Sequence, residues 1–144
     1  MKKIYFLIAT ALLAVTFTSC QKDEEMNEQV NKETNEQDLY GKWQNKKNTQ
    51  WYRVFYNDIV ADDPTYKWGK EWHENEGIYE KDLTEHGNGW FKWRKSNNNL
   101  LEIEMMEYGW AEIPQENTIT VLTATEFSYK RQDGTIYSFT KVTE

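Results

Sequence analysis

Hydrophobic and polar residues alternate in short runs along residues 39–144, and this pattern favours β-strands over helices. Aromatic and β-branched runs recur about every 8–12 residues with turn-forming residues between them, a spacing typical of all-β sandwiches and barrels. No stretch of about 12 residues in this part repeats its apolar positions with a clean helical period. The pattern therefore predicts one all-β domain of about eight or nine antiparallel strands.

The first half of this domain contains four expected strands, at residues 41–45, 50–56, 66–72 and 76–82. In the third of them Tyr66, Trp68 and Trp72 share one parity, which is the alternation of a strand with an aromatic face. The polar turn at 46–48 separates the first two strands.

A hairpin is expected around residues 97–99, where three asparagines form the loop because asparagine accepts a positive φ. This register sets Arg94 opposite Glu102 and Lys92 opposite Glu104, so that the charged face lies outside. The opposite face, directed inward, then carries Phe91, Trp93, Leu101, Ile103 and Met105.

The last hairpin turns at residues 132–134, with Gly134 in the left-handed position, and follows an expected strand at 117–122. Its register pairs aromatic residues with one another, Tyr129 with Tyr137 and Phe127 with Phe139. In so short a chain, an antiparallel up-and-down barrel removes exposed sheet edges. An open half-barrel and a sandwich are the alternatives.

The N-terminus has the three-part layout of a secretory signal peptide. Met1 is followed by two lysines, then by an apolar run over 4–17 and by the small or hydroxylated pair Thr18 and Ser19. The run is shorter than the roughly 20 residues that span a bilayer. We therefore expect residues 1–19 to be a signal peptide.

The sequence Phe17-Thr18-Ser19-Cys20 resembles the lipobox of bacterial lipoproteins. The resemblance implies that Cys20 receives a diacylglycerol and further acyl chains such as palmitate, and anchors the mature protein to the outer membrane. Residues 21–25 resemble the lysine-plus-acidic signal of lipoproteins displayed on the exterior of some Gram-negative bacteria. A protein on the periplasmic face is the alternative location.

Residues 20–38 are expected to be the lipidated cysteine and a disordered acidic tether. Residues 21–38 carry seven acids and two lysines, with few apolar side chains to offset the ordering entropy. Removing residues 1–19, which hold two lysines and no acid, lowers the formal net charge from −7 to −9. This balance argues against nucleic acid as a partner.

The opening Gly41-x-Trp43 of the domain resembles the start of lipocalins and related small barrels. The resemblance extends over residues 39–144 and implies a lipocalin-like barrel, in which Trp43 plugs the closed end and Gly41 lets the chain pass over it. No familiar pattern covers residues 57–88.

Motifs for catalysis and cofactors are not found in the sequence. It has no nucleophile elbow, phosphate-binding glycine loop or dinucleotide fingerprint, and its one cysteine is the expected lipidation site. His73 and the aspartates at 58, 62 and 63 lack the full ligand patterns of zinc and calcium sites. We therefore expect neither a metal or cofactor site nor an enzyme, and the alternative is a hydrolase that uses a pair of carboxylates.

The surplus of aromatic residues predicts a binding function. All seven tryptophans fall within residues 39–144. Those near glycines and expected loops are the candidate contacts for a small apolar or glycan ligand, and the candidate set is Tyr66, Trp68, Trp72 and Trp110. The alternative is an accessory or inhibitor protein that docks another protein through its outer face, where Trp90 is expected beside Lys92 and Arg94.

Overall fold

The computed structural model describes residues 34–143 of the chain. Its nine strands are β1 (Gly41–Asn45), β2 (Trp51–Val60), β3 (Asp63–His73), β4 (Trp90–Ser96), β5 (Asn99–Met106), β6 (Gly109–Trp110), β7 (Gln115–Leu122), β8 (Glu126–Lys130) and β9 (Ile136–Lys141). Three short 3₁₀ helices accompany them, η1 (Glu36–Leu39), η2 (Glu74–Glu76) and η3 (Glu80–Asp82).

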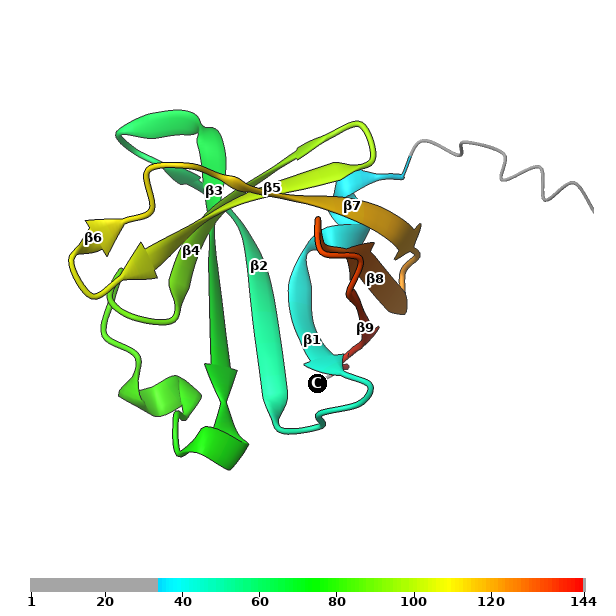
Figure 1. Cartoon of the computed structure of the whole chain (residues 1–144), viewed down its shortest axis with the longest axis horizontal. Helices are drawn as coiled ribbons and strands as arrows, with labels where there is room; N and C mark the ends of the chain where they lie inside the picture. Colours follow the sequence, from blue (N-terminus) through cyan, green and yellow to red (C-terminus); the bar gives the residue numbers. More distant parts are fainter. Residues whose placement is uncertain (1–33, 144) are drawn as a thin grey trace, which may run out of the picture. The chain divides into compact units, whose positions relative to one another are not determined.

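Eight of these strands form a closed antiparallel barrel in which each strand pairs with its neighbour in the chain. β1 pairs with β9 and closes the barrel, while the short β6 pairs only with the end of β5. Figure 1 shows β1 to β5 side by side, with β6 projecting from one edge. The predicted up-and-down barrel is confirmed, and the half-barrel and sandwich alternatives are wrong because the β1–β9 ladder leaves no open sheet.

The alternation of strand direction gives the barrel two different ends. At one end η1 packs beneath the barrel, and the loops are short, at residues 61–62, 97–98 and 123–125. We call this the closed end. At the other, the open end, the connections are longer, at residues 46–50, 74–89, 107–114 and 131–135.

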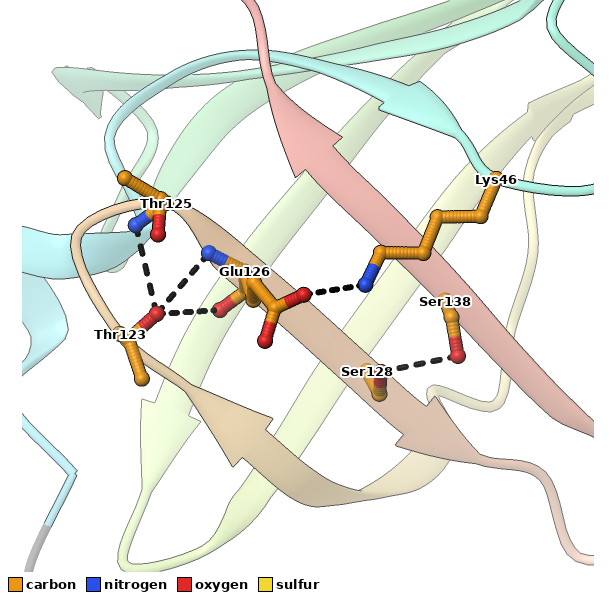
Figure 2. A network of polar contacts seen from close by, with 6 residues as sticks. All are labelled: Lys46, Thr123, Thr125, Glu126, Ser128 and Ser138. Carbon is orange, nitrogen blue, oxygen red and sulfur yellow. Dashed lines mark hydrogen bonds and ion pairs between the residues drawn. The ribbon is translucent and has the colours of Figure 1, made fainter.

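The predicted register of the last hairpin is confirmed, with Tyr129 opposite Tyr137 and Phe127 opposite Phe139. Gly134 has φ +87°, the left-handed conformation expected of it. On the outer side Ser128 donates to Ser138 at 2.9 Å, as Figure 2 shows. The same view shows Thr123, whose hydroxyl accepts from the backbone N–H of Thr125 and Glu126 and so closes the β7–β8 turn.

The predicted register of the β4–β5 hairpin is wrong by one residue. The turn contains only Asn97 and Asn98, with Asn97 at φ +53°, and it places Glu102 opposite Trp93. Phe91 and Trp93 face inward as expected, but Glu102 and Glu104 share that inner face. Leu101, Ile103 and Met105 lie on the outer face instead.

The strand expected over 76–82 is also wrong. This segment carries η2 and η3, and Gly77 between them has φ +75°. No place in the sheet is free for it, because β3 pairs directly with β4 through Lys67–Trp93 and the following residues. Residues 74–89 instead form a long connection that extends beyond the strands in Figure 1.

Aromatic side chains fill the interior of the barrel. Phe55 is 1% exposed, and its ring centroid lies 5.3–5.6 Å from those of Phe91, Trp93 and Phe127. Gly69 makes room for this packing, since a Cβ at that position would lie 2.3 Å from the ring of Phe91. The other buried aromatic residues of the same cluster are Trp43, Trp51, Tyr129 and Phe139.

The closed end is organised around Trp43, which has no exposed surface. Its indole N–H donates to the carbonyl of Leu39 at 2.7 Å, and the side chain of Leu39 is buried in the same core. Gly41 has φ +110° and begins β1 beside them. Residues 34–38 were expected to belong to the tether, but they adjoin the barrel, where the carboxylate of Glu36 pairs with Lys67.

The expected signal peptide, the lipidation site Cys20 and most of the tether lie outside the described residues. Within residues 34–143 no helix combines the length and apolar character needed to cross a bilayer.

Candidate functional site

A charged group lies inside the barrel, in the half nearer the open end. Arg53 of β2 is 2% exposed, and its guanidinium forms ion pairs with Glu102 at 2.5 Å and with Glu71 at 3.0 Å. It also donates to the hydroxyl of Tyr129 at 3.2 Å. Asn117 donates to the second oxygen of Glu102 at 2.8 Å, so that the polar partners of this carboxylate come from two other strands, β2 and β7.

Burial dominates the protonation equilibria of this group. Burial raises the pKa of Glu102, against the attraction of Arg53, and the nearby carboxylates of Glu71 and Glu104 raise it further. Burial likewise raises the pKa of the Tyr129 hydroxyl, although Arg53 opposes the shift. The pKa of Arg53 itself is raised because its two carboxylate partners outweigh the cost of burial.

This arrangement offers little room for a substrate. The cavity beside Glu71 and Glu104 measures about 60 Å³ and is bounded by Trp90 and Phe91. Within residues 34–143 no group of three or more histidine, cysteine, aspartate or glutamate side chains is placed to hold a metal ion. The charged group therefore has the geometry of an internal cross-link between strands.

Of the four predicted ligand contacts, the structure brings Trp68 and Trp110 together. Their ring centroids lie 5.7 Å apart on the outer wall, with the ammonium of Lys92 4.8 Å from the ring of Trp110. His86 stacks on Trp68 at 3.8 Å, and Trp90 meets both rings edge-on at 5.1–6.0 Å. These rings pack against one another outside the barrel, and each of them is only half-exposed.

The other two predicted contacts lie apart from this group. Trp72 is 1% exposed and stacks on Tyr52 at 5.3 Å, while Tyr66 lies under the guanidinium of Arg94. The 74–89 connection lies along this wall because Glu80 forms ion pairs with two of its lysines, Lys42 and Lys70. The prediction that Tyr66, Trp68 and Trp72 share one face of their strand is correct. That face lies on the outside of the barrel.

Most of the exposed apolar side chains belong to the open end of the barrel. Of the eight large hydrophobic residues that are exposed in the described part, six belong to its loops or to the strand ends beside them. Tyr108 is 95% exposed and Ile113 is 80% exposed. We call the set the apolar rim, and its members are Ile78, Tyr79, Met106, Tyr108, Ile113 and Ile136.

Two surface cavities open at the same end, one on each side of the β8–β9 turn. The larger, of about 410 Å³, lies between residues 113–117 and residues 131–133. The smaller, of about 280 Å³, lies between the β1–β2 loop and residues 135–138, and the rings of Trp51 and Tyr137 line it. Rim residues border both cavities, Ile113 the first and Ile136 the second.

The sequence contained one overlooked sign of the internal charged group. Trp51, Arg53 and Phe55 share the inward parity of β2, so that an arginine stands among core aromatics. The apolar rim had no such sign, because its residues lie in loops that show no alternation. Comparisons of this chain with protein-family models, with curated proteins and with solved structures found no match.

Proposed function

We propose that this chain is a lipid-anchored outer-membrane lipoprotein that docks another protein with the open end of its barrel. The observation that carries the proposal is the apolar rim. Exposed apolar residues scattered over a protein surface are normal, whereas six of the eight described ones at one end of a barrel favour an interaction site there. A tyrosine that is 95% exposed at a turn tip is also the kind of side chain that anchors interfaces.

The filled interior supports an external mode of action. Ligands of barrel proteins generally occupy an interior that side chains leave empty. Here Trp43, Trp93 and Phe127 have no exposed surface, and Arg53 and Glu102 occupy the region below the open end. Partners are thus expected at the loops rather than within the barrel.

The test is site-specific photo-crosslinking with the full-length protein in its own cells. A photoreactive residue in place of Tyr108 is expected to give a discrete protein adduct, because the position is exposed within the rim. The matched control replaces Ile59, which is 59% exposed but lies at the closed end. Equal adducts at both positions, or none at Tyr108, would contradict the proposal.

The smaller cavity favours a second candidate function, the binding of a small glycan or apolar ligand. Trp51 and Tyr137 stand edge-to-face at 5.0 Å beside the side chains of Asn48 and Lys47, a combination of flat rings and polar groups suited to a sugar.

Titration of residues 21–144 with fatty acids and oligosaccharides is expected, on this second candidate, to give a saturable change in tryptophan fluorescence. A Tyr137→Ala variant is expected to weaken the response because it removes one ring of the cavity. The control is Tyr66→Ala on the outer wall. A response that is equal in both variants places the ligand elsewhere and removes this candidate.

A further inference from the structure

The larger open-end cavity lies where the pairing between β7 and β8 ends. β7 pairs with β5 along residues 115–118, but β8 reaches only to Lys130, which stands opposite Thr118. Beyond that point the chain turns away through residues 131–135. The cavity of about 410 Å³ occupies this gap, between the first residues of β7 and the β8–β9 turn.

The hydrogen-bonding direction of β7 shows which backbone groups face the gap. The N–H of Ile119 donates to the carbonyl of Asn98 at 2.7 Å, so this pair is directly hydrogen-bonded. In an antiparallel ladder such pairs alternate with pairs whose N–H and C=O point the other way. In the register of β5 and β7, Glu116 belongs to a pair that is not hydrogen-bonded. Its N–H and C=O therefore point away from β5 and toward the gap. Among the described residues, the β8–β9 turn supplies no backbone partner to it.

The charge of this end indicates the character of an occupant. The open-end loops hold eight acids and four bases. Of these, Glu80 pairs with lysines of the strands and Lys46 pairs with Glu126, so the acids outnumber the bases among the remaining side chains as well. At the cavity itself Glu116 and Asp133 are exposed and Arg131 is half-buried, so its lining holds two acids and one base, and Ile113 adds an apolar contact.

We propose that an extended, basic segment of the partner protein adds to β7 at Glu116 and completes the wall of the barrel. Such strand addition takes affinity from main-chain hydrogen bonds and specificity from the side chains on either side. The acidic rim selects a segment rich in lysine and arginine, and Ile113 contacts an apolar residue of it. This inference rests on the proposed docking function and specifies its mode.

The test places the photoreactive residue at Ile113 and compares Glu116→Pro with Glu116→Gln. Proline removes the N–H that faces the gap, which the β5 ladder does not use, whereas glutamine keeps it. The adduct yield is expected to be about tenfold lower for Glu116→Pro than for Glu116→Gln. Near-ultraviolet circular dichroism of both variants checks that the barrel is intact.

A separate variant tests whether the acidic side chains at the cavity contribute to binding of the segment. Glu116→Gln combined with Asp133→Asn is expected to lower the adduct yield about threefold, and added salt is expected to lower the wild-type yield. Sequencing of the adduct is expected to find lysine or arginine beside the crosslinked residue. Adducts that are insensitive to Glu116→Pro, that contain an acidic segment, or that join two copies of this chain overturn the inference.

The outcomes separate this inference from the docking proposal. Adducts at Tyr108 and Ile113 that persist in a folded Glu116→Pro variant leave docking in place and remove strand addition. If Glu116→Pro does not fold, a peptide with the crosslinked sequence is added to the wild type. Slower hydrogen exchange at the Glu116 amide then supports the inference, and unchanged exchange overturns it.

Discussion

Replacing Arg53 by methionine is expected to lower the free energy of unfolding by about 3–5 kcal/mol, because it leaves a buried carboxylate without its cation. Glu102 is 2% exposed and has Arg53 as its ionic partner at 2.5 Å. A loss of this size is a large part of the roughly 5–15 kcal/mol that holds a domain of this kind folded. Chemical denaturation of residues 21–144 measures it.

The loss is expected to depend on pH. Without Arg53 the attraction that lowers the pKa of Glu102 is gone, while burial still raises it. The pKa in the folded variant then lies above its unfolded value, so that protonation stabilises the folded variant as the pH falls. The difference from wild type is therefore expected to be smaller at about pH 5 than at about pH 8. A loss that is the same at both would contradict this account.

Two further variants show whether the unpaired charge or the lost packing causes the destabilisation of Arg53→Met. Glu102→Gln leaves Arg53 with Glu71 and Tyr129, and is expected to cost about 1–2 kcal/mol. The double variant with Arg53→Met and Glu102→Leu removes both charges, and is expected to regain most of the stability, since buried ion pairs are often replaceable by apolar residues. If the double variant is as unstable as Arg53→Met, packing rather than charge explains the loss.

The same ion pair explains why one hairpin was predicted correctly and the other was not. In the β8–β9 hairpin aromatic residues pair with aromatic residues on one face, and serine pairs with serine on the other. Because Gly134 also fixes the turn, residues close in sequence determine the register. In the β4–β5 hairpin local matching favours Arg94 opposite Glu102. The actual partner of Glu102 is Arg53, 49 positions away, which a comparison of adjacent strands does not consider.

The candidate site was less predictable than the fold. Alternation identifies the two faces of a strand but not which of them encloses the core, and the aromatic face of Trp68 and Trp72 is on the outside. It is covered there by the 74–89 connection, whose Glu80 bridges Lys42 and Lys70. Rim residues such as Tyr108 lie in loops, where exposure depends on how the finished barrel presents each turn.

Cys20→Ser is expected to abolish membrane attachment completely. If Cys20 carries the anchor, several acyl chains, each contributing about 0.8 kcal/mol per buried methylene, are lost together. Residues 34–143 contain no cysteine, so the barrel itself is expected to be unchanged. Incorporation of labelled palmitate and partition into the membrane fraction measure the effect, with Ser19→Ala as the control that keeps a small residue before the thiol. Surface display is then tested by adding protease to intact cells, where digestion of the wild type places the barrel outside and protection places it on the periplasmic face. A Cys20→Ser protein that still incorporates palmitate and remains with the membrane would remove the lipoprotein proposal, because the anchor would then lie elsewhere in the chain.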